Sequence, residues 1–206
     1  MSANFRFISI VGTLVVLVAG FLALLFYFSN SAFRSVEVEP EQVFGKEVPE
    51  TFHVHSAYIT KQGSILELAD KESGISLSLV KSPVNFESRL GSLTPQMAFE
   101  QVRAYRLGLE APEELLTSFS VRYASAHFDS RRAKGGSSYQ IQLGDLTLDF
   151  FPFRVGRDSF FHLGVMNTGS SEQVLILMMQ KGQDFPSSQT TTTLEQLGIS
   201  KWFDLN

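Results

Sequence analysis

The chain has 206 residues, with 17 Lys and Arg against 21 Asp and Glu, and its net charge is −4 with the histidines neutral. It has no cysteine, which excludes disulfides, zinc–cysteine sites, iron–sulfur clusters and thiol catalysis. All acidic residues follow the apolar N-terminal segment, and no basic face is available to replace counterions on phosphates. We therefore expect no nucleic-acid partner.

A tail of residues 1–6 precedes an apolar segment, residues 7–29, in which no residue is charged. A helix of about 22 residues covers about 33 Å, enough to cross a hydrocarbon core of about 30 Å. A cleaved signal peptide has a shorter apolar region, about 7–15 residues, and ends at small residues. The segment therefore predicts a retained transmembrane helix, with a cleaved signal peptide as the alternative.

The orientation of this helix follows from its flanks. Arg6, the free amine and the very short tail favour a cytoplasmic N-terminus, which makes the rest of the chain exocytoplasmic, and periplasmic if the cell is bacterial. Small residues on the helix would allow close packing against a second copy, giving a homodimer, or against another membrane subunit. These residues are Gly12, Ala19, Gly20 and Ala23.

Residues 30–51 are rich in glutamate and contain two prolines. Such a composition predicts an extended, solvated tether between the membrane helix and a folded domain. The exported domain is then expected over residues 52–206, a usual size for one hydrophobic core.

Alternating patterns predict strands over residues 52–60, 64–70 and 74–81. A helix is expected over 94–109, because Thr94 can cap its start and Gly108 can end it. Its predicted apolar face consists of Ala98, Val102, Tyr105 and Leu109.

From residue 118 the pattern predicts a meander of strands, with a polar loop over 187–193. The expected strands cover residues 118–128, 137–143, 146–153, 159–167 and 173–180. Gly144 and Asp145 predict a two-residue hairpin turn. Its register pairs Leu143 with Leu146, Ile141 with Leu148 and Tyr139 with Phe150. The expected fold class is α+β: a twisted antiparallel sheet with one main helix packed on it.

One face of this sheet is expected to carry Gln140, Asp149 and Phe151. A turn centred on Gly156 and Arg157 would add His162 beside Phe151. A carboxylate diagonal to an imidazole can bind a ligand or exchange protons. The alternative is a sheet face turned to solvent, where alternating polar residues are usual.

His53 and His55 are spaced to lie on the same side of one strand, as in some metal sites. A third ligand would have to come from His127, Asp129 or His162, and the sequence places none of these nearby. A polar edge strand is the alternative interpretation.

These features predict a non-enzymatic binding, scaffold or assembly component of an envelope membrane complex, in contact with the bilayer and with other membrane or envelope proteins. No cofactor is predicted. The alternatives are a membrane-tethered hydrolase or metal-dependent enzyme, using Asp149 and His162 or the His53–His55 pair, and a carrier of a small ligand or lipid.

Overall fold

The computed structural model describes residues 35–83, 94–110, 116–167 and 172–202. The chain divides into two units, residues 1–36 and 37–206, and nearly all described residues belong to the second. The expected membrane helix over 7–29, with Gly12, Ala19, Gly20 and Ala23, lies outside the described residues. Among the helices that the structure describes, none has the length and apolar character needed to cross a bilayer.

The strands of the described chain form a single sheet, antiparallel in every pair for which the register is known. They are β1 (Val36–Glu37), β2 (Phe52–Thr60), β3 (Gly63–Asp70), β4 (Ser76–Pro83), β5 (Ala133–Gly135), β6 (Tyr139–Leu143), β7 (Leu146–Val155), β8 (Ser159–Asn167) and β9 (Glu172–Lys181). Their order is β1-β2-β3-β4-β9-β8-β7-β5, and β6 pairs with β7. The predicted α+β class with a mainly antiparallel sheet is confirmed.

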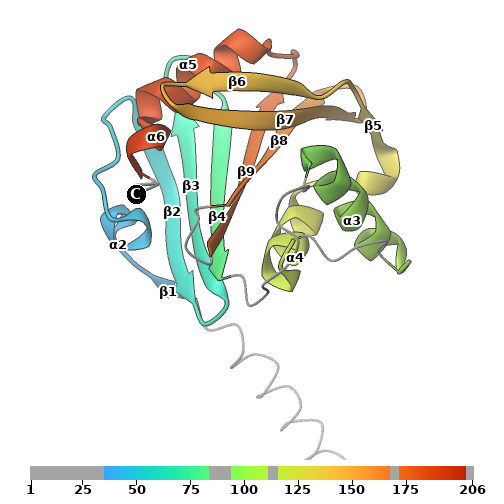
Figure 1. Cartoon of the computed structure of the whole chain (residues 1–206), viewed down its shortest axis with the longest axis horizontal. Coiled ribbons are helices and arrows are strands. Elements are labelled where there is room, and N and C mark those ends of the chain that lie inside the picture. Colours follow the sequence, from blue (N-terminus) through green and yellow to red (C-terminus); the bar gives the residue numbers. More distant parts are fainter. Residues whose placement is uncertain (1–34, 84–93, 111–115, 168–171, 203–206) are drawn as a thin grey trace, which may run out of the picture. The chain divides into compact units, whose positions relative to one another are not determined.

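Helices lie on both faces of this sheet (Figure 1). They are α2 (Pro40–Phe44), α3 (Pro95–Leu107), α4 (Ser118–His127), α5 (Ser187–Leu197) and α6 (Ile199–Trp202), with a short 3-10 turn η1 (Ser130–Arg132). The sheet is strongly twisted and curved, so β6 and β7 pass across one end of β2, β3 and β4.

The curvature produces two hydrophobic cores, one on each face. The first core contains Leu66 from β3, Leu77 from β4, Phe150 from β7 and Leu194 from α5, all fully buried. The second core lies between the other face and helices α3 and α4, and its centre is a group of phenylalanine rings. Phe153 and Phe161 stack there with ring centroids 5.0 Å apart. Because both faces are covered, β9 is buried along nearly its whole length, as its apolar sequence predicts.

The hairpin between β6 and β7 has the predicted register. Leu143 pairs with Leu146, Ile141 with Leu148, and Tyr139 with Phe150. Gly144 has a positive φ of 63°, which both two-residue hairpin turn types require at this position.

The strand predicted over 118–128 is wrong, because these residues form α4. The Thr117 hydroxyl accepts the Ser120 N–H and caps the helix start. Val121 and Ala124, three residues apart, are both buried against the sheet, as expected for a helix. The alternation of apolar and polar residues in this segment hides that spacing in the sequence.

The polar loop predicted over 187–193 is also wrong, because this segment forms most of α5. Threonine is a poor helix former, but Thr190 and Thr193 are buried here together with Leu194 and Leu197. Tertiary packing therefore overrides the local preference.

Helix α3 confirms the predicted cap at Thr94 and the left-handed end at Gly108. Its apolar face was predicted only in part. Ala98 and Val102 are buried, whereas Tyr105 and Leu109 are 51% and 61% exposed.

The extended tether predicted over 30–51 is wrong for the part that the structure describes. Helix α2 runs from Pro40 to Phe44 and is followed by the C-cap Gly45, which has φ 78°. Val43 and Phe44 are buried in the first core, and Val48 packs against that core. These apolar residues lie between glutamates, so the average composition conceals them.

Candidate functional site

The structure places Asp149 and His162 on opposite faces of the sheet. Pro152, not Phe151, pairs with His162, because Val155 pairs with Ser159 across a three-residue turn. The expected two-residue turn is one residue too short, and a shift of one residue moves every side chain to the other face. The predicted carboxylate–imidazole pair is therefore not formed.

His162 is buried in the first core, where it contacts α5 and β6. Its Nδ1 lies 2.5 Å from the Tyr139 hydroxyl and 2.9 Å from the Thr190 hydroxyl, and these two hydroxyls are 2.9 Å apart. Phe185 stacks on the imidazole with ring centroids 3.9 Å apart. Burial lowers the pKa of His162 to about 4, so the ring is neutral at physiological pH. The cluster holds α5 on the sheet.

Of the other two members of the predicted site, Gln140 lies next to Asp149, whereas Phe151 does not. Gln140 and Asp149 are exposed, and the amide Nε2 donates to the carboxylate Oδ1 at 3.0 Å. Phe151 is buried against Phe99, with ring centroids 5.0 Å apart. The polar face of β6 and the first half of β7 is thus a solvent-facing surface, the alternative interpretation of its sequence.

His53 and His55 do lie together, with ring centroids 4.9 Å apart, although a bulge interrupts the strand between Val54 and Ser56. In the part of the chain that the structure describes, no group of three or more His, Asp or Glu side chains is arranged to hold a metal ion. His127 bonds elsewhere and His162 is buried, so neither completes the predicted site.

An acidic residue that the sequence did not single out, Glu67 of β3, is the centre of a polar cluster below α4. Its Oε2 accepts a hydrogen bond from the Ser56 hydroxyl at 2.6 Å, and its Oε1 accepts one from Tyr123 at 2.5 Å. The same Oε1 lies 3.3 Å from His127 Nε2. His127 Nδ1 lies 2.8 Å from the carbonyl of Tyr123, so both ring nitrogens face acceptors.

These contacts shift the pKa values of the cluster. The hydrogen bond from His127, with those from Ser56 and Tyr123, holds the pKa of Glu67 down to about 2 against the opposing effect of burial. The hydrogen bond to Glu67 raises the pKa of His127, and burial raises the pKa of Tyr123. A cavity of about 190 Å³ adjoins the cluster. The Glu67 carboxylate already accepts hydrogen bonds from three donors. It is therefore better placed to hold α4 against β3 than to transfer a proton.

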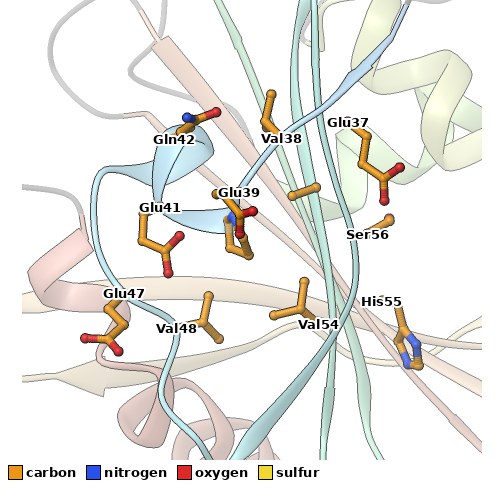
Figure 2. Close-up of a pocket in the computed structure, with 12 residues that line it drawn as sticks. Glu37, Val38, Glu39, Glu41, Gln42, Glu47, Val48, Val54, His55 and Ser56 are labelled. Carbon is orange, nitrogen blue, oxygen red and sulfur yellow. The ribbon is translucent and has the colours of Figure 1, made fainter.

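A second feature is an open groove of about 750 Å³ between α2 and β2. Four glutamates line it, together with His55. Figure 2 shows Val48 and Val54 approaching each other across the groove. The lining glutamates are Glu37, Glu39, Glu41 and Glu47. The groove thus combines an apolar floor with an acidic rim.

The groove also lies along the side of β2 that pairs with the two-residue strand β1. Val38 N donates to the Ala57 carbonyl at 3.0 Å, and Phe52 N donates to the Pro49 carbonyl at 2.9 Å. Between these points, Val54, His55 and Ser56 line the groove, and among the described residues no backbone hydrogen bond outside regular strand pairing is made to this side of β2. An unpaired strand edge is a template for an added strand.

Sequence reasoning missed both features for identifiable reasons. Tyr123 and His127 are four residues apart, a spacing that places them on one helix face only if the segment is helical. The groove depends on α2, which the tether interpretation excluded. Glycine at position 45 and proline at position 40 were the available signals for that helix.

No protein-family model matches the chain, and the comparison with curated proteins finds no significant relative.

Proposed function

We propose that this chain is a single-pass membrane protein whose exocytoplasmic domain binds a basic, extended segment of a neighbouring envelope protein without catalysing a reaction. The groove between α2 and β2 carries this proposal. Its four carboxylates complement lysine and arginine side chains, and the β2 edge can pair with an extended backbone. The apolar segment over 7–29 supports the membrane anchor.

The other polar clusters support binding rather than catalysis. Asp149 and His162 face different sides of the sheet, and the Glu67 carboxylate is occupied by three donors. Neither cluster presents a free base next to a nucleophile in an accessible cavity.

The test is photocrosslinking in intact membranes. A photoreactive amino acid replaces Gln42, which lines the groove, or Asp145, an exposed residue in the distant β6–β7 turn. We expect a discrete covalent protein adduct from position 42 and none from position 145.

Charge reversal then tests the recognition. The double change Glu39→Lys and Glu47→Lys should abolish the position-42 adduct, whereas Glu100→Lys on the distant helix α3 should preserve it. An adduct that survives reversal of the groove charges, or no adduct at all, overturns the proposal.

A further inference from the structure

A second surface, here called the basal surface, lies where α3, α4 and the turn between β2 and β3 meet. It is a hollow of about 910 Å³ lined by side chains of all three elements. Its defining residues are Lys61, Tyr105, Leu109, Glu110 and Arg122. Arg122 Nη2 donates a hydrogen bond to the side-chain amide oxygen Oε1 of Gln62 at 2.7 Å. This bond fixes α4 to the β2–β3 turn.

The basal surface exposes apolar and aromatic side chains. Tyr105 is 51% exposed and Leu109 is 61% exposed, and Phe119 lies beside them in the hollow. A tyrosine and a leucine beside cationic side chains are the composition that favours a membrane interface. Lys61 and Arg122 supply the positive charges and Glu110 the one acidic lining residue, in contrast to the four glutamates of the α2–β2 groove.

The path of the chain places this surface near its N-terminal entry point. Val38 bonds to Ala57, close to the end of β2 at Thr60, and Lys61 follows directly. Figure 1 shows the β2–β3 turn and α4 at the same end of the sheet. The polypeptide therefore enters the folded unit at the end that carries the basal surface.

The length of the connection limits how the domain can turn. Only residues 30–36 separate the apolar segment from Glu37, and seven residues reach at most about 25 Å when fully extended. A domain of about 170 residues is about 40 Å across by the scaling of the radius of gyration. If that segment is embedded in a membrane, a connection of this length favours an orientation in which the end that carries the basal surface faces the bilayer.

We propose that the basal surface contacts the interfacial region of the lipid bilayer, with Tyr105 and Leu109 among the headgroups and with Lys61 and Arg122 next to lipid phosphates. This inference rests on the retained membrane helix of the proposed function. It orients the domain so that the acidic groove opens sideways to a partner in the same membrane.

The absence of cysteine makes the test direct, because a single introduced cysteine is a unique labelling site. The full chain carrying Leu109→Cys or Asp145→Cys is labelled with an environment-sensitive fluorophore. Each protein is reconstituted into vesicles of phosphatidylcholine and phosphatidylglycerol that contain a nitroxide headgroup lipid. We expect at least threefold stronger quenching at position 109 than at 145, and a weaker signal at 109 when Tyr105→Ser is added.

Two failures are distinguishable. If alkaline carbonate removes the chain from the vesicles, the membrane anchor fails and this inference fails with it. If the chain is retained but positions 109 and 145 are quenched equally, the basal contact alone is overturned and the anchored binding module stands.

Discussion

His162 is a buried, uncharged imidazole, and its burial makes folding depend on pH. The unfolded chain binds a proton near pH 6.5, whereas the folded chain does so only near pH 4. Below pH 6.5 the unfolded state therefore gains protons first, and stability is lost as the pH falls toward 4.

We expect this one residue to lower the free energy of unfolding by about 2 kcal/mol between pH 7 and pH 5. In His162→Leu this contribution should disappear, while the Tyr139 and Thr190 hydroxyls can still bond to each other. Urea denaturation of the full chain in detergent at pH 7 and pH 5 measures this change in the free energy of unfolding. The control is His53→Leu, at an exposed histidine. An unchanged difference between the two pH values in His162→Leu would contradict the assignment.

The residues around His162 also show what a sequence can and cannot predict. Tyr139 was assigned correctly to an apolar pair with Phe150, because the hairpin turn fixes that register locally. His162 was assigned to the wrong face, because its register depends on the length of the loop after Val155. One additional turn residue reverses the face, and composition does not reveal that difference.

At the scale of elements, α4 is fixed to β3 by the pair of Glu67 and His127. The lowered pKa of Glu67 stabilises the fold above pH 4.5, and this contribution is lost as the pH falls toward 2. The raised pKa of His127 stabilises the fold below pH 6.5, and this contribution is lost as the pH rises through the raised value. The pair therefore stabilises the fold most between about pH 4.5 and pH 6.5.

Removing the charge of Glu67 tests this assignment. In Glu67→Gln we expect the pKa of His127 to fall, because its main hydrogen-bond partner is then neutral. Titration of the His127 ring protons by NMR measures the change, and Glu100→Gln on the surface of α3 is the control. An identical His127 titration in Glu67→Gln and the native chain would show that the contact does not set the pKa.

Elements with strong local signals were predicted, and elements made by tertiary contacts were not. Strands β2, β3, β4 and helix α3 have periodic patterns bounded by turn or cap residues, and all four were found. Helix α5 contains four consecutive threonines, so its helical state depends on burial against the sheet. Helix α2 has only five residues, too few for any periodicity to be visible.

At the scale of the whole molecule, the folded unit begins well before the first long strand. Phe44 is 7% exposed and belongs to the first core, so the α2 segment stabilises the domain. We expect Phe44→Ala to lower the free energy of unfolding by about 3–5 kcal/mol, the usual cost of removing a buried ring. Chemical denaturation measures the loss.

Glu41→Ala, on the exposed side of the same helix, should change stability by no more than about 0.5 kcal/mol. If Phe44→Ala were as stable as the native chain, α2 would be a passive part of the linker, and the groove between α2 and β2 would lose its fixed wall.

The position of β9 has a consequence for synthesis. This strand comes late in the chain but lies between β4 and β8, and so joins the two halves of the sheet. Until residues 172–181 leave the ribosome, the apolar edges of both halves have no partner. The two halves of the sheet can therefore join cooperatively only after residues 172–181 have been synthesised.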